Sequence, residues 1–228
     1  FRRVLFRSNW IGRASSAAET GIVWHTSPIM KIEDTFSRET IVGGTGPTSS
    51  TVFIPHLLNN LAGTRFKVIT GFNSTNEIGI AMERGEVEGS ATPVESLKSY
   101  RAGWVRDRKI RVLLLWSAQR EPDLPDTPSM VELGRTEEAR KILKCYGSAG
   151  DIGRSVVAPP GLPAERVETL RRAFDAVMKD TTFHEEARRA GVEIKPLTGE
   201  KLQEMVAEVA TFPRELVGKA RDAREAKR

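Results

Sequence analysis

The sequence has very little cysteine and histidine. Cys145 is the single cysteine among 228 residues, and the three histidines, His25, His56 and His184, are widely separated. One thiol cannot close an internal disulfide or supply a cysteine-based zinc site, and the histidines lack the i, i+4 spacing of helical metal ligands. The sequence therefore predicts no disulfide framework, no metal site and no cofactor.

Long apolar runs are also absent. The longest uninterrupted one spans residues 112–116, far short of the roughly 20 residues that cross a bilayer. Hydrophobic residues nevertheless make up 39% of the chain and charged residues 29%, which suits a packed core and excludes a disordered tail.

A basic face is lacking as well. Three of the five excess positive charges come from Arg2, Arg3 and Arg7, and the rest of the chain interleaves acids with bases. A nucleic-acid binder would carry its basic residues within the fold, so we expect no nucleic-acid partner. Residues 1–8 also lack the apolar stretch and cleavage site of a signal peptide. We interpret them as a ragged or non-native end, with any targeting segment upstream.

What is present is a regular alternation of strand-like and helix-like segments. This pattern predicts an α/β fold of parallel, doubly wound sheets with helices on both faces. The expected strands are 39–44, 66–70, 86–90, 110–117, 152–158 and 192–195. The expected helices are 52–61, a segment around 77–84, 94–102, 163–179, 183–190, one capped by Thr198 and one begun by Pro213.

The most distinctive local feature is the loop GGTGPTSST, residues 43–51, between a strand and a helix. Glycines allow close approach of a ligand to the backbone, and a helix N-terminus supplies unpaired N–H groups with partial positive charge. The loop is therefore a candidate anion cradle, although an ordinary helix cap with a glycine turn is an equal alternative. Ser49 replaces the third glycine of a dinucleotide fingerprint, and no lysine makes a P-loop. The candidate ligand-binding residues here are Gly44, Thr45, Gly46, Thr48, Ser49 and Ser50.

Two further loops are candidates by position, because ligands of doubly wound sheets bind outside the carboxyl ends of the strands. Small polar residues also populate ordinary loops, which is the alternative. These additional candidates are Gly71, Phe72, Asn73, Ser74 and Thr92.

Catalytic groups are not evident. Glu83, Glu86 and Glu88 lie in the charged segment MERGEVEG, where we expect them to be solvated with Arg84 as a partner. General acid–base catalysis needs a sheltered carboxyl group with a shifted pKa. Neutral donors without catalytic groups suit reversible capture of an anion, so we expect no enzyme.

With these residues in view, the chain resembles the substrate-binding proteins of tripartite tricarboxylate transporters, the Bug receptors. The resemblance runs from about Trp10 to near the C-terminus. Its motifs are WIG (10–12), GGTGPTSS (43–50), NNLAGTRFKVITGF (59–72), AMERGEVEG (81–89), DLPDTPSMVEL (123–133), APPGLPAERVETLRRAFDAVMKD (158–180) and PLTGEKLQ (196–203).

The resemblance implies a periplasmic protein with a two-lobed, type II periplasmic binding protein-like fold that holds a small carboxylate in an interlobe cleft. It implies delivery of a di- or tricarboxylate or related organic acid to transporter membrane subunits, by a monomer. Residues 39–117 would form lobe 2, and residues 9–38 with 118–228 the remainder of lobe 1. Thr45, Gly46 and Ser49 are the positions carried over from the family's ligand loop.

The chain departs from the family pattern at two places. Family members usually run to about 300 residues, so the first lobe is expected to be incomplete through N-terminal truncation. The family's frequent Gly-Tyr-x-Gly is here Gly71-Phe72-Asn73-Ser74, which lacks the phenol hydroxyl. The alternatives are a ligand-sensing module of a regulator and a small α/β enzyme acting on an anionic substrate.

Overall fold

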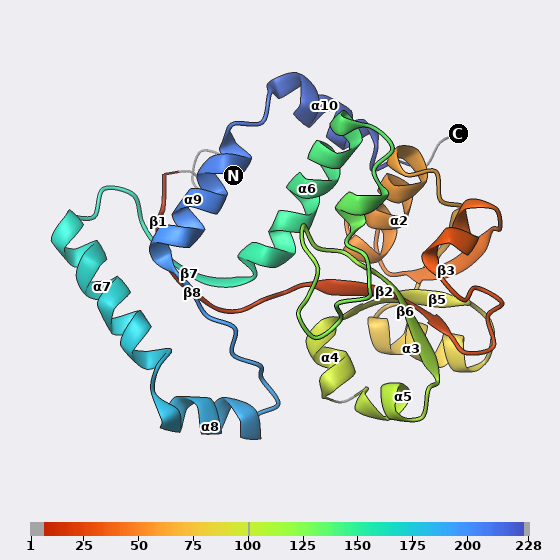
Figure 1. Cartoon of the computed structure of the whole chain (residues 1–228), viewed down its shortest axis with the longest axis horizontal. Helices are drawn as coiled ribbons and strands as arrows, with labels where there is room; N and C mark the ends of the chain where they lie inside the picture. The colour runs from red at the N-terminus through yellow and green to blue at the C-terminus, as the bar shows by residue number, and fades with distance from the viewer. Residues whose placement is uncertain (1–6, 100, 226–228) are drawn as a thin grey trace. The chain divides into compact units, whose positions relative to one another are not determined.

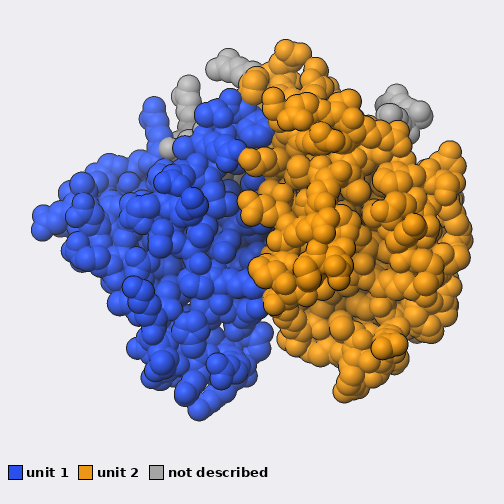
Figure 2. Space-filling model, in the orientation of Figure 1, with its two compact units in different colours: residues 1–17, 148–212 blue, residues 18–147, 213–228 orange. Residues whose placement is uncertain are grey.

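The computed structural model describes residues 7–99 and 101–225. The chain divides into two compact units, which Figure 2 colours separately. Unit 1 comprises residues 1–17 and 148–212, and unit 2 comprises residues 18–147 and 213–228. These divisions differ from the expected lobe boundaries at 38/39 and 117/118, chiefly because residues 18–38 and 118–147 belong to the unit that carries the glycine-rich loop.

Unit 2 contains a five-stranded mixed sheet of order β4-β3-β5-β2-β6 (Figure 1). The strand β3 runs parallel to both β4 and β5, as the alternating pattern predicted. The strand β2 is antiparallel to both β5 and β6, so the prediction of a wholly parallel sheet is wrong at this strand. The strands are β2 (Glu19–Trp24), β3 (Thr40–Gly44), β4 (Phe66–Thr70), β5 (Gly89–Pro93) and β6 (Ile110–Leu115).

Helices cover both faces of this sheet. A Cβ added to Gly43 would lie 2.4 Å from Ile78 of α3, and one added to Gly44 would lie 2.6 Å from Val52 of α2. Neighbouring residues of a strand point to opposite faces, so α2 and α3 pack on opposite sides, as expected for a doubly wound arrangement. The helical segments of this unit are η1 (Ile32–Phe36), α2 (Ser50–Leu61), α3 (Thr75–Glu83), α4 (Val94–Lys98), α5 (Ala102–Arg106), η2 (Met130–Leu133) and α10 (Arg214–Asp222).

The core beneath α3 is closely packed, and Ile78 and Met82 are fully buried against Ile22 and Trp24 of β2. The opposite face retains a small cavity of about 20 Å³, whose lining includes Val42 and Trp116. That volume is about one water molecule, so the cavity is a packing defect of the core.

Unit 1 contains a three-stranded sheet of order β7-β1-β8, in which the central strand is antiparallel to both neighbours. Helices pack on both faces of this sheet, since Trp10 contacts α9 and Ile11 contacts α7, but its strands are antiparallel where the alternation predicted parallel ones. The expected strand 192–195 is absent, and the short β8 follows it instead. The elements are β1 (Asn9–Ser15), β7 (Arg154–Ala158), α7 (Ala164–Val177), α8 (Thr181–Arg189), β8 (Leu197–Thr198) and α9 (Gly199–Ala210), and α6 (Glu137–Ile152) crosses the boundary between units at residue 147.

Helix ends follow the sequence closely. Gly63 adopts φ +80° just after α2, and Gly191 adopts φ +70° just after α8, where glycine tolerates the left-handed conformation. Thr198 caps α9 by accepting a hydrogen bond from the N–H of Lys201. Pro55 lies in the second turn of α2, where it removes the donor that would reach the carbonyl of Thr51.

Candidate functional site

The candidate loops lie at one edge of the unit 2 sheet. The register pairs Gly44 with Thr70 and Val42 with Gly89, so the carboxyl ends of β3, β4 and β5 meet at the same edge. The loop 45–49, the loop 71–74 and Thr92 therefore share this edge, as the sequence predicted from strand order.

The loop 45–49 is organised around the hydroxyl of Thr51, a buried residue that sequence reasoning did not single out. The N–H of Thr45 donates to Thr51 Oγ1 at 3.0 Å, and the hydroxyls of Thr45 and Ser49 lie 3.2 and 2.8 Å from the same atom. Ser49 is the N-cap of α2. These contacts fix the loop before any ligand binds, which lowers the entropic cost of binding.

The same loop leaves backbone donors unused. Within residues 7–99 and 101–225, the N–H groups of Gly46, Thr48 and Ser50 have no acceptor. A Cβ built on Gly46 would have no atom within 4 Å, so open space adjoins this part of the loop. Unused N–H groups at the start of a 12-residue helix are suited to an anion.

The loop 71–74 is more fully occupied by its own contacts. The N–H and side-chain amide of Asn73 donate to Glu77 Oε2 at 2.7 and 3.1 Å, and Ser74 caps α3 by accepting from the N–H of Glu77. Phe72 packs against the core beneath α3. Gly71, at φ +112°, makes the turn. The polar side chains of Asn73 and Ser74 therefore already hydrogen-bond with Glu77 at the start of α3.

Thr92 is almost completely buried, with 1% of its surface exposed. Its carbonyl accepts a hydrogen bond from the Thr20 hydroxyl at 2.9 Å, while its own hydroxyl has no partner in the structure. Thr92 therefore lies under this edge of the sheet, facing the interior.

Glu19 is the residue at this edge that sequence reasoning missed. Because β2 is antiparallel to β5, its first residue pairs with Pro93, at the carboxyl end of β5. Burial raises the pKa of Glu19 above its ordinary value of 4.5, and the nearby hydroxyl of Ser50, the first residue of α2, offsets part of that rise. The alternation of ETGIVW was the available signal for this strand.

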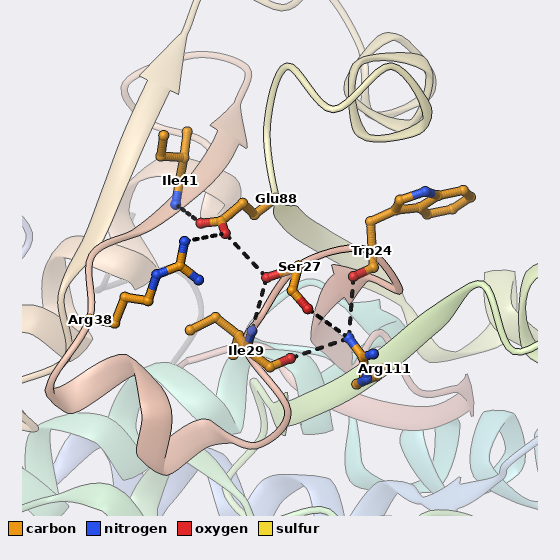
Figure 3. Close-up of polar contacts among 7 residues, drawn as sticks. All are labelled: Trp24, Ser27, Ile29, Arg38, Ile41, Glu88 and Arg111. Carbon is orange, nitrogen blue, oxygen red and sulfur yellow. Dashed lines mark hydrogen bonds and ion pairs between the residues drawn. The ribbon is translucent and has the colours of Figure 1, made fainter.

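A second polar cluster lies near the opposite ends of these strands (Figure 3). Glu88 accepts hydrogen bonds from the N–H of Ile41 at 2.9 Å and the hydroxyl of Ser27 at 3.3 Å, and it pairs with Arg38 at 3.3 Å. Its side chain is 19% exposed, so the expectation that Glu88 is solvated is wrong. Glu88 directly precedes β5, and its carboxylate accepts the N–H of Ile41 on the neighbouring strand β3.

Arg111 completes this cluster by binding backbone carbonyls. Its guanidinium donates to the carbonyls of His25 at 2.9 Å, Ser27 at 3.1 Å and Ile29 at 3.4 Å (Figure 3 shows the last two). The cluster therefore holds the chain that leaves β2, and we interpret it as structural. Of the other two glutamates, Glu86 pairs with Arg84 at 3.8 Å in solvent, as expected, and Glu83 accepts a hydrogen bond from the Trp104 indole.

The described ranges contain no group of three or more His, Cys, Asp or Glu side chains placed to hold a metal ion. No helix within those ranges has the length and apolar character needed to cross a bilayer.

Comparison with known proteins gives a consistent fold. No protein-family model matches the chain, and no curated protein matches it in sequence. A TctC solute-binding protein from Polaromonas is similar in structure, with a TM-score of 0.68 and 17% identity over 94% of this chain and 70% of that one. A protein of R. palustris solved with adipate gives a TM-score of 0.59 at 17% identity, over 96% and 69% of the two chains. The periplasmic binding protein BugD gives 0.52 at 19% identity, over 93% and 69%.

These similarities establish fold, and they agree with the family that the sequence motifs resemble. The mixed α/β units, the parallel strands β4-β3-β5 and the helices on both faces of their sheet are the arrangement that the resemblance implied. The chain therefore has the periplasmic binding protein-like fold of the TctC and Bug solute-binding proteins.

Proposed function

We propose that the chain is a solute-binding receptor that captures a small organic carboxylate reversibly at the loop 45–50. The observation that carries the proposal is the set of unused N–H donors of Gly46, Thr48 and Ser50 at the start of α2. Such donors bind an anion without breaking a covalent bond. Two similar structures support the class of ligand, since one was solved with adipate and another with malate.

The wider role follows from the fold resemblance. We propose that the protein acts in the periplasm, as a monomer without a cofactor, and delivers its ligand to the membrane subunits of a tripartite tricarboxylate transporter. Gly44, Gly71, Phe72 and Thr92 remain predicted contributors to the site. The side chains of Asn73 and Ser74 would first have to leave Glu77.

The test is thermal unfolding with a panel of organic acids, followed by calorimetry of any acid that stabilises the protein. A ligand at 100 times its Kd should stabilise the fold by about 2.7 kcal/mol. The variant Gly46→Ala places a methyl group in open space, so it should leave the fold intact and weaken binding. Gly218→Ala is the matched control, because its Cβ also meets no atom within 4 Å. The proposal fails if no acid stabilises the protein. It also fails if both variants bind the acid as tightly as the unmodified chain does.

A further inference from the structure

The strand β7 is an uncovered edge of the unit 1 sheet. It pairs with β1 on one side, and within the described residues no strand pairs with its other side. Two neighbouring valines of this strand are exposed, Val156 to 49% and Val157 to 47%. An edge strand presents unpaired backbone N–H and C=O groups, so an edge that also carries exposed valines is a template for another strand.

The two valines lie on opposite faces of the sheet, because successive residues of a strand alternate between its faces. Ala158 packs with Val167 of α7, which places Val156, two residues earlier, on the α7 face. Val157 pairs with Trp10, which packs against α9 on the other face. A helix could cover only one of these valines, whereas an additional strand beside β7 would place side chains against both.

The helix α7 extends the apolar surface towards this edge. Its Val167 and Phe174 side chains pack on the sheet, and Arg171 reaches the first turn of α9, directly after β8. At 3.6 residues per turn, Leu170 and Val177 lie about 100° and 120° round the helix from Arg171, on the side away from β8. Leu170 is 42% exposed and Val177 is 45% exposed. These two side chains therefore lie towards the free edge of β7.

The similar solved structures build this fold from longer chains. The TctC protein from Polaromonas aligns with 94% of this chain, and the aligned part is 70% of its own length. Polypeptide that enters unit 1 through β1 also arrives one strand away from the free edge, since Asn9 pairs with Ala158 of β7.

We propose that β7 is a docking edge for a further strand of the receptor's own polypeptide, from outside residues 1–228, with apolar side chains on both of its faces. That strand completes the unit 1 sheet and covers Val156, Val157, Leu170 and Val177. The proposal concerns the assembly of unit 1, so it stands or falls independently of the ligand.

Hydrogen exchange tests the proposal on two proteins, residues 1–228 and the product of the complete coding sequence that contains them. The amide groups of residues 155–157 should exchange at least about tenfold more slowly in the longer protein, at a rate that does not depend on its concentration. The strand β4 is the internal control, because it is an edge of the unit 2 sheet. Its exchange should be the same in both proteins.

A charged side chain at the edge provides the second measurement. Val157→Lys in the longer protein should return residues 155–157 to the fast exchange seen in residues 1–228, while α9 stays protected and shows that unit 1 remains folded. Val217→Lys is the matched control, at a side chain that is 42% exposed on α10 of unit 2, and it should leave residues 155–157 protected.

Three results would overturn the proposal. The first is equal exchange of residues 155–157 in the two unmodified proteins, or a coding sequence that adds no residues to the 228. The second is protection in the longer protein that rises with its concentration, because a second copy would then cover the edge. The third is protection that persists in Val157→Lys.

Discussion

The two units of this chain are stabilised in different ways. Of the twelve largest fully buried side chains in the described residues, eleven belong to unit 2 and one, Leu202, to unit 1. Five large apolar side chains of unit 1 are nevertheless exposed, namely Val156, Val157, Leu170, Val177 and Val192. Unit 2 thus relies on the burial of apolar side chains around a five-stranded sheet. The three-stranded sheet of unit 1 buries much less apolar surface.

Arginines bound to backbone carbonyls stabilise unit 1, as Arg111 does unit 2. Arg13 donates to the carbonyl of Lys195 at 3.1 and 3.2 Å and to that of Asp151. Arg171 donates to the carbonyl of Trp10 at 3.0 Å and pairs with Glu200 at 2.9 Å. These contacts join β1 to segments more than 130 residues away in sequence. The contrast between the units therefore lies in apolar burial, because polar cross-links of this kind occur in both.

The largest effect should come from the core of unit 2. Met82→Ala removes a fully buried side chain beneath α3 and should lower the free energy of unfolding by about 2–4 kcal/mol. Leu170→Ala, at a side chain that is 42% exposed on α7, should change it by less than about 0.5 kcal/mol. Chemical denaturation measures both. Equal losses in the two variants would remove the contrast between the units.

In unit 1, the loss of a polar cross-link should lower the free energy of unfolding more than the loss of an exposed apolar side chain does. Arg171→Met retains most of the side-chain volume but leaves the Trp10 carbonyl without this donor, at a cost of about 1–3 kcal/mol. Hydrogen exchange should then accelerate in β1 and α9 while α3 and β5 stay protected. The matched change in unit 2 is Arg111→Met, which should accelerate exchange in residues 25–29 instead. Uniform acceleration over both units in either variant would contradict this assignment.

The edge of the unit 1 sheet should control self-association. The strand β7 pairs with β1 on one side, and within the described residues no strand pairs with its other side. Val157→Lys adds a charge to this edge and should reduce concentration-dependent association with little change in stability. Val177→Lys makes the same change on α7. Sedimentation at increasing concentration should show a larger effect of Val157→Lys, and equal effects would mean that the edge is not responsible.

The sequence predicted the parts of the fold in which local and tertiary signals agree. The strands of residues 40–44 and 66–70, the helices of residues 164–177 and 199–210 and the loop between β3 and α2 all follow from periodicity and capping. The strands β1 and β2 were missed because Gly12 and Gly21 interrupt their short apolar patterns. Glu19 was missed for the same reason, since only the antiparallel pairing of β2 brings it to the carboxyl end of β5.

The smallest effect concerns two ion pairs, one in each unit. Arg120 donates to both carboxylate oxygens of Glu132 in unit 2, at 2.8 and 2.6 Å, and these bonds hold the pKa of Glu132 at about 2. In unit 1 the pKa of Glu200 is also lowered, first by its own backbone N–H and then by the charge of Arg171. A two-point contact should shift a carboxyl pKa further than a one-point contact.

Carbon-13 NMR of labelled glutamate should therefore find Glu132 titrating at lower pH than Glu200. A lowered pKa in the folded state contributes stability above pH 4.5, and that contribution is lost as the pH falls from 4.5 towards 2. Because the Glu132 side chain is 41% exposed, solvent screening limits it to less than about 1 kcal/mol. Arg120→Met should return the pKa of Glu132 towards 4.5 and flatten the acid limb of the stability curve. An unchanged titration in Arg120→Met would assign the low pKa to the N–H of Ser129, which donates to Glu132 at 2.8 Å.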